Sequence, residues 1–243
     1  MKLSERLQLI ADEINKGETM ADIGTDHGFL PLYLLETGKC PHVVMADISS
    51  GSLKKAEDNC RALHPEREYN LRLGNGIDVL QDGEVDVVVI AGMGGLLIAD
   101  ILEWNLAKSR SIKRYILQPR NHVGRLRHWL ADNGFLITKE SLVREGKFIC
   151  EILTVNSGFP QSKEAAPYSA AFDYPDSLLT FRNHLTKEYL ERKLEIEEKI
   201  YKNISAHSKS VETETISCRE RINRLEHLLE KLYDENHGAE ASL

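Results

Sequence analysis

Residues 20–31, MADIGTDHGFLP, connect a short apolar run to a helical pattern through a turn that contains Gly24 and Gly28. Glycine in such a turn permits positive φ and lets a ligand approach the backbone closely. The spacing is D-x-G-x-D-x-G and differs from the dinucleotide pattern G-x-G-x-x-G. Asp26 stands where a pyrophosphate would need an uncharged residue, whereas a carboxylate attracts a cation. The turn therefore favours S-adenosylmethionine (SAM), with its sulfonium and ammonium groups, over NAD or ATP. The alternative is that Asp22 and Asp26 only cap the helix.

Short β-prone runs and helical periods alternate on both sides of this turn. We expect a first helix at 4–15, further helices at 29–37, 50–63, 95–106 and 122–132, and a loop or short helix at 74–84. The expected strands are 19–23, 42–47, 69–73, 85–90, 113–118, 134–142 and 148–155. Runs such as VDVVVIAG are apolar on both faces, as buried parallel strands require. The alternation predicts an α/β fold with a doubly wound, Rossmann-like sheet.

The last two strands lack a helical pattern between them. Arg144, Glu145 and Gly146 form the short connection, which favours an antiparallel hairpin. We therefore expect five parallel strands and an antiparallel terminal pair.

The C-terminal third reads as helical. Residues 156–175 hold Gly158 and three prolines and indicate a linker or an irregular segment. One helical stripe follows, a break is expected at 205–210, and a heptad-like seam comes after it. The stripe is Leu178, Phe181, Leu185, Tyr189, Ile196, Ile200 and Ile204; the seam is Val211, Thr215, Cys218, Ile222, Leu225, Leu229 and Leu232. We predict an antiparallel, coiled-coil-like hairpin, with one helix of a dimeric coiled coil as the alternative. The domains are expected at 1–157 (catalytic) and 158–243 (linker and hairpin).

The ends of the first four strands hold the candidate cofactor site. Asp47 follows Gly24 by 23 residues, where an acid can accept hydrogen bonds from both ribose hydroxyls. Asn75 can bond the adenine edge, although Asn-Gly is also a simple turn. The expected cofactor-binding residues are Asp22, Gly24, Thr25, Asp26, His27, Gly28, Asp47, Ile48, Asn75, Gly76, Ala91 and Gly92.

The ends of the fourth and fifth strands, IAGMGG and LQPRNH, are the candidate acceptor side. The glycines of the first could form a floor for a flat substrate, or could only allow a tight turn and close helix packing. Pro119 directs the second segment toward the same cleft. The expected catalytic residues are Asp26, Met93, Gly94, Gln118, Pro119, Asn121 and His122.

Together these segments resemble the bacterial TrmK family, the tRNA (adenine(22)-N1)-methyltransferases, within the class I SAM-dependent methyltransferases. The resemblance is carried by LSERLQLIADEI, MADIGTDHGFLP, Asp47, LGNGIDVL, IAGMGG and ILQPRNHVGRLRHWL. It implies SAM as methyl donor, tRNA as acceptor and a Rossmann-like domain followed by a helical hairpin. Enzymes that methylate exocyclic amines often carry Asn/Asp-Pro-Pro-Tyr where this chain has Ala91-Gly92-Met93-Gly94. The difference fits a ring nitrogen as acceptor.

The basic residues cluster although the chain is acidic. The 243 residues carry 31 Lys and Arg against 38 Asp and Glu, a formal net charge of −7, which argues against a generally basic binder. Residues 104–131, however, contain no acid and seven cations, which predict a local RNA-phosphate surface. They are Lys108, Arg110, Lys113, Arg114, Arg120, Arg125 and Arg127. A solvated helix face balanced by acids elsewhere is the alternative.

Composition excludes several classes of protein. With 42% hydrophobic and 28% charged residues, the chain is neither fibrous nor disordered. No run is long and apolar enough for a membrane span, and the start reads as an amphipathic helix rather than a signal peptide. The four cysteines and nine histidines show no metal-ligand spacing, so we expect reduced thiols, no metal and a cytoplasmic monomer or weak homodimer. A small-molecule or protein methyltransferase and a non-catalytic nucleotide- or RNA-binding module remain alternatives.

Overall fold

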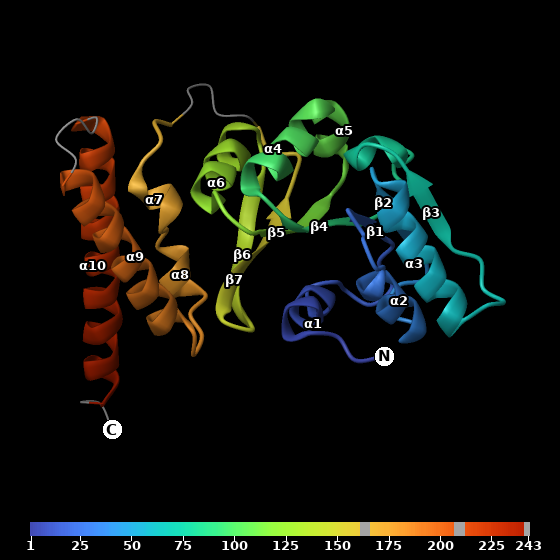
Figure 1. Cartoon of the computed structure of the whole chain (residues 1–243), viewed down its shortest axis with the longest axis horizontal. Helices are drawn as coiled ribbons and strands as arrows, with labels where there is room; N and C mark the ends of the chain where they lie inside the picture. Colours follow the sequence, from blue (N-terminus) through green and yellow to red (C-terminus); the bar gives the residue numbers. More distant parts are fainter. Residues whose placement is uncertain (161–165, 207–211, 241–243) are drawn as a thin grey trace.

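Seven strands form one mixed sheet in the order β3-β2-β1-β4-β5-β7-β6, in a computed structural model that describes residues 1–160, 166–206 and 212–240 (Figure 1). The first five strands are parallel, and β7 pairs antiparallel with both β5 and β6. Their bounds are β1 Met20–Ile23, β2 Val43–Asp47, β3 Asn70–Leu73, β4 Val87–Met93, β5 Arg114–Pro119, β6 Leu136–Glu145 and β7 Phe148–Asn156. The predicted combination of parallel strands and a terminal antiparallel hairpin is confirmed.

Helices cover both faces of the sheet (Figure 1). One layer contains α1 Glu5–Asp12, α2 Phe29–Glu36 and α3 Ser50–Leu63; the other contains the short 3-10 helix η1 Gly76–Val79, α4 Gly95–Trp104, α5 Leu106–Ser111 and α6 Val123–Asp132. Successive strand side chains point to opposite faces, so Val87 and Val89 pack into the first layer's core while Val88 and Ile90 pack into the second. This arrangement explains why the strands are apolar on both faces.

The helix boundaries follow local capping. Ser4 and Ser49 are the N-caps of α1 and α3, and their hydroxyls accept from the amides of Leu7 and Ser52. The expected helix at 95–106 ends earlier, at Trp104, because Asn105 breaks it and caps the separate helix α5 with its side chain.

The C-terminal region differs from the single helical stripe that the sequence predicted. Leu178 belongs to the short helix α8 Ser177–Thr180, which follows α7 Ala170–Asp173, and the long helix α9 Thr186–Ala206 begins only after a break. Phe181 lies in that break, and Phe181, Ile196 and Ile200 are exposed, so these members of the stripe are not core residues. The expectation of an irregular linker is wrong at α7, since residues 166–175 pack on α6 through Tyr168 and Phe172.

The last helix, α10 Glu212–Glu240, returns along α9 (Figure 1). Tyr233 donates to Glu191 at 3.3 Å, and Arg221 donates to Glu197 at 2.9 Å, so the two helices run antiparallel. The seam positions Cys218, Ile222, Leu225, Leu229 and Leu232 are buried. Val211 and residues 207–210 of the expected break lie outside the described residues. A coiled-coil supercoil and the domain boundary stay predictions.

Three further observations concern the chain as a whole. All four cysteines are free thiols. Within the described ranges, no helix is long and apolar enough to cross a membrane, and no cluster of His, Cys, Asp or Glu could hold a metal ion.

Candidate active site

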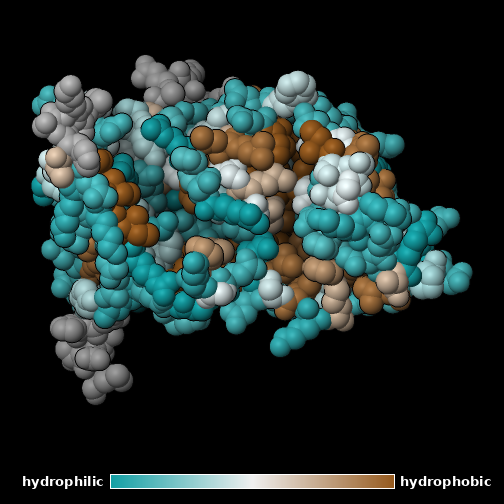
Figure 2. Space-filling view, viewed as in Figure 1, coloured by the Kyte–Doolittle hydropathy of each residue, from teal (hydrophilic) through white to brown (hydrophobic). Residues whose placement is uncertain are grey.

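A cavity of about 450 Å³ opens at the carboxyl ends of β1, β2 and β4. It lies where ligands bind in open α/β sheets. Figure 2 shows a crevice near the middle of this face, with hydrophobic residues along it. Eleven of the twelve expected cofactor residues line the cavity, as does Met93. They are Asp22, Gly24, Thr25, Asp26, His27, Asp47, Ile48, Asn75, Gly76, Ala91 and Gly92.

Asp22 supplies a buried carboxyl group at the end of β1. Its Oδ2 accepts from Thr25 Oγ1 at 2.9 Å. Burial raises the pKa of Asp22 from 3.8 to about 6, against the smaller lowering effects of the Thr25 hydrogen bond and of the Arg6 charge, while the nearby Asp47 raises it further. A cationic ligand in the cavity would favour the ionised form of this carboxyl. This property makes Asp22 the residue best suited to receive positive charge.

Asp26, the acid that the sequence pattern emphasised, already has partners. Lys55 donates to its Oδ1 at 3.0 Å, and His27 Nε2 lies 3.6 Å from its Oδ2. Its backbone has φ of 43°, which places the exposed side chain at the cavity rim. The structure thus brings Asp26 to the cavity, but as the ion-pair partner of Lys55.

Asp47 and Asn75 lie on the opposite side of the cavity from β4, at the ends of β2 and β3. Asp47 Oδ1 accepts from the amide of Ser49 at 2.8 Å, and its Oδ2 accepts from the amide of Asp26 at 3.4 Å. These backbone donors orient the carboxylate and leave lone pairs free for further donors. The N-cap of α3 is the neighbouring Ser49, so Asp47 does not cap this helix.

Glycine is required at the positions of the site for different structural reasons. Gly24 has φ of 78°, and a Cβ there would overlap the end of the Met93 side chain. Gly95 packs α4 against the β5–α6 connection, since a Cβ would come within 2.7 Å of the carbonyl oxygens of Asn121 and His122. Gly28 and Gly94 do not line this cavity. Gly28 lets α2 approach Ala56 and Met45, and Gly94 faces Asn121. The close-packing interpretation therefore holds for Gly94 and Gly95.

Gln118 joins three segments of the site although it is only 2% exposed. Its Oε1 accepts from the Gly92 amide and from Arg6 Nη1, both at 3.1 Å. Arg6 Nε in turn donates to Glu145 at 2.6 Å. Gln118 therefore holds the end of β4 in place, which makes it a positioning residue. Arg6 was missed from the sequence; its only signal is a cation within the amphipathic first helix.

A second cavity of about 700 Å³ adjoins the first, and Arg6 and Arg120 line both. Gln118, Pro119, Asn121 and His122 line this second cavity, so the expected acceptor-side residues gather in one place. The sequence did not predict its far wall, which comes from the β6–β7 hairpin and the C-terminal helices. That wall includes Phe148, Glu151, Asp173, Tyr174, Tyr189 and Lys193.

The seven cations of residues 104–131 do not form one face, so that expectation is wrong. Lys108, Arg110, Lys113 and Arg114 lie near the start of β5, which is the opposite edge of the sheet from the cavities, and Arg114 pairs with Glu18 there. Arg127 is 3% exposed and pairs with Glu140 at 2.8 Å and Glu151 at 2.5 Å. Arg120 and Arg125 are the exposed cations beyond the carboxyl end of β5. The alternation of the chain between sheet edges separates residues that are close in sequence.

Comparison with known proteins agrees with this geometry. A family model described as "Methyltransferase domain" matches residues 3–153, so this part of the chain is a methyltransferase domain. A curated tRNA (adenine(22)-N(1))-methyltransferase of Bacillus subtilis is 31% identical over 98% of this chain and 99% of its own length. The chain belongs to the tRNA (adenine(22)-N1)-methyltransferase family, as the sequence motifs predicted.

Two solved structures extend the similarity to bound ligands. A Streptococcus pneumoniae protein in complex with S-adenosyl-L-methionine has a TM-score of 0.79 at 30% identity, covering 94% of this chain and 100% of that chain. TrmK of M. capricolum, in complex with S-adenosyl-homocysteine, has a TM-score of 0.77 at 27% identity, covering 95% of this chain and 99% of that chain.

Proposed function

We propose that this protein is a SAM-dependent tRNA methyltransferase that methylates N1 of an adenine, adenine 22 in the numbering that its relative's name uses. The observation that carries the proposal is the buried carboxyl group of Asp22, which accepts a hydrogen bond from Thr25 and lies in a glycine-lined cavity that also contains Asp47. A positively charged ligand with a ribose fits this set of groups. A diphosphate does not.

The cavity suggests one orientation for SAM. Asp47 would accept the ribose hydroxyls, and Ile48 and Asn75 would flank the adenine near β2 and β3. The methionine portion would then lie between Gly24 and Gly92, with its charge toward Asp22. This assignment moves the cation-binding role from Asp26 to Asp22, because Asp26 is exposed and already forms an ion pair with Lys55. Asp26 would instead shape the rim through its positive φ.

When bound, SAM supplies an electrophilic methyl group. N1 of adenine carries an in-plane lone pair and needs no base before it attacks, so the chain's task is to hold the base in line and exclude water. Gln118 holds the Gly92 turn through a hydrogen bond from the Gly92 amide, and the end of the Met93 side chain packs against Gly24. None of the expected catalytic residues needs to act as a general base. The target base must leave its stack to reach this position.

Radiolabelled methyl transfer tests the proposal. Purified protein and labelled SAM should transfer label to unmodified tRNA and not to a protein extract or a nucleoside pool. Asp47→Ala should abolish SAM binding in calorimetry and also abolish transfer. Label on protein or small molecules, with none on tRNA, would replace this function by one of the alternatives. We expect the enzyme to act in the cytoplasm. We also expect a monomer or weak homodimer, and analytical sedimentation would measure this oligomeric state.

A further inference from the structure

The second cavity has the size and position of an acceptor site. Its volume of about 700 Å³ exceeds that of the first, and pockets of this size hold ligands as large as a nucleotide. If SAM takes the orientation proposed above, the methyl group lies toward Arg6 and Arg120, which are the residues that the two cavities share. A base in the second cavity would therefore meet the methyl group at this boundary.

The carboxylates and the cations of the second cavity differ in whether they have direct partners. Each of its carboxylates has a partner: Glu145 accepts from Arg6, Glu151 from Arg127, and Asp173 from Tyr168 at 2.5 Å. Within the described ranges, no carboxylate forms an ion pair with either Arg120 or Lys193. The charge of Lys193 helps to lower the pKa of Glu151, but neither Lys193 nor Arg120 has a direct ion-pair partner in these ranges, and phosphate oxygens are the groups that such cations bind.

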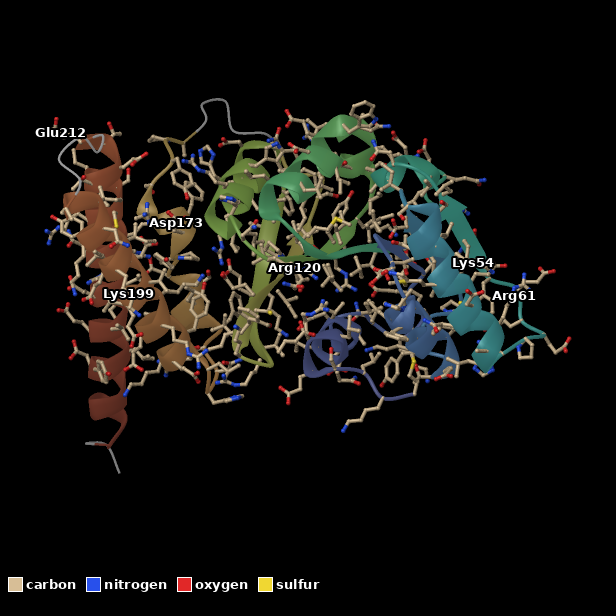
Figure 3. All side chains as sticks on the ribbon, in the orientation of Figure 1. Lys54, Arg61, Arg120, Asp173, Lys199 and Glu212 are labelled. Atoms are coloured by element: carbon tan, nitrogen blue, oxygen red, sulfur yellow. The ribbon has the colours of Figure 1, made fainter. Side chains whose placement is uncertain are left out.

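An aromatic surface accompanies these cations. Phe148 at the start of β7 is 64% exposed and lines the cavity, although burying it would be favourable. Lys193 of α9 also lines the cavity, and its ammonium lies 5.2 Å from the ring centre of Tyr189. An exposed aromatic ring that shares a cavity with cations lacking a direct ion-pair partner is typical of sites that bind unstacked RNA bases with their phosphates. Figure 3 shows Arg120 near the centre of the molecule, with Asp173 toward the C-terminal helices.

We propose that the C-terminal helices form one wall of the RNA site, in which Lys193 binds a phosphate of the flipped target nucleotide and Phe148 stacks on its base or on a neighbouring base. This proposal rests on the proposed function, since it names further contacts of the same RNA substrate. The hairpin then contributes directly to substrate binding. Lys193 is a positioning residue for the substrate and takes no part in bond making.

Lys193→Ala tests the phosphate contact, with Lys199→Ala as the matched control. Lys199 (labelled in Figure 3) is on the same helix, closer to its C-terminal end, and its side chain is 74% exposed. At saturating SAM, Lys193→Ala should raise KM for unmodified tRNA roughly three- to tenfold and reduce the salt slope of binding by about one. The SAM affinity should stay unchanged, Lys193→Arg should restore KM, and Lys199→Ala should match the unaltered protein.

Phe148→Ala provides an independent second variant, because Phe148 is exposed and its loss should not unfold the chain. It should raise KM by a similar factor, while Phe148→Tyr retains activity. A KM equal to that of the Lys199→Ala control in both Lys193→Ala and Phe148→Ala would overturn the proposal. An equal loss of SAM affinity in both would also overturn it, since the residues would then be structural. Failure of the proposed function would look different: SAM would bind, but the unaltered protein would not methylate tRNA.

Discussion

The carboxyl group of the single residue Asp22 couples ligand binding to proton binding. Its carboxyl has a pKa of about 6 in the folded protein against 3.8 ordinarily, so the folded state holds more protons than the unfolded state between these values. The free energy of unfolding of the ligand-free protein therefore falls as pH rises through this window, by at most about 3 kcal/mol. A bound cation would stabilise the ionised carboxylate and so offset this loss of folding stability.

Asp22→Asn should remove both effects. The variant keeps an oxygen that can accept from Thr25, so the fold should persist and its stability in urea should exceed that of the unaltered ligand-free protein at pH 7. SAM affinity should weaken at least tenfold at pH 7.5. In the unaltered protein, affinity should fall as pH drops below 6, whereas in Asp22→Asn it should not change with pH. Calorimetry at several pH values measures this, and equal affinities at pH 7.5 would refute the role of Asp22.

Gly95 illustrates a residue that the site needs for packing. Gly95→Ala places a methyl group against two backbone oxygens of the β5–α6 connection, so we expect a loss of about 1–3 kcal/mol in the free energy of unfolding. Gly51→Ala is the control, since it also lies in a first helical turn and its Cβ would meet only Ser49 Oγ at 3.7 Å. Similar stability of the two variants in urea denaturation would contradict the packing argument.

Among the elements, α6 connects the two parts of the chain through Arg127. This side chain pairs with Glu140 of β6 and Glu151 of β7, and the hydroxyl of Tyr189 on α9 donates to Glu151. Arg127 balances the charge of buried carboxylates and holds the pKa of Glu151 below its usual value in spite of the opposing effect of burial. The network therefore docks α9 on the sheet.

Arg127→Met should lower the free energy of unfolding by about 3–5 kcal/mol, because it leaves buried carboxylates without their cation. Arg125→Met changes the same helix, but its guanidinium stacks on the Tyr168 ring at 3.7 Å in an exposed position, so the loss should stay below about 1 kcal/mol. Urea denaturation of the two variants measures the difference. Losses of equal size would show that burial of Arg127 has little effect on stability.

The elements themselves could largely be predicted from sequence where local signals are strong. The helix expected at 50–63 is observed as Ser50–Leu63, because Ser49 caps it. The central strands were predictable because their side chains are apolar on both faces of the sheet. The break before α9 could not be predicted, since Phe181 continues the helical period while the chain turns there. The insertion of β7 between β5 and β6 also depends on long-range pairing.

The candidate site was only partly predictable, for a similar reason. Gly24, Asp47 and Gly92 could be placed because parallel strands bring their carboxyl ends to one edge. Arg6 lies 112 residues from its partner Gln118 in the chain, Lys193 comes from the C-terminal helices, and no local pattern marks either residue. The basic run failed as a surface because β5 carries its two ends to opposite edges of the sheet.

On the scale of the whole molecule, the position of a cation relative to the sheet edge should decide its effect on RNA binding. Arg120→Gln at the boundary of the two cavities should weaken tRNA affinity and reduce its salt dependence, with a smaller effect on SAM affinity. Lys113→Gln at the other edge, where the side chain is 82% exposed, should have little effect. Filter binding over a salt series measures both, and a larger effect of Lys113→Gln would mean that RNA approaches the opposite edge.

In the proposed reaction, the sheet edge formed by β1, β2 and β4 holds SAM while its methyl group passes to N1 of one tRNA adenine. Mass spectrometry of unmodified tRNA after incubation with the protein and SAM locates the methylated atom. We expect one added methyl group, on N1 of adenine 22. Methylation of an exocyclic amine or of another nucleotide, or tRNA left unmethylated by SAM-bound protein, would contradict it.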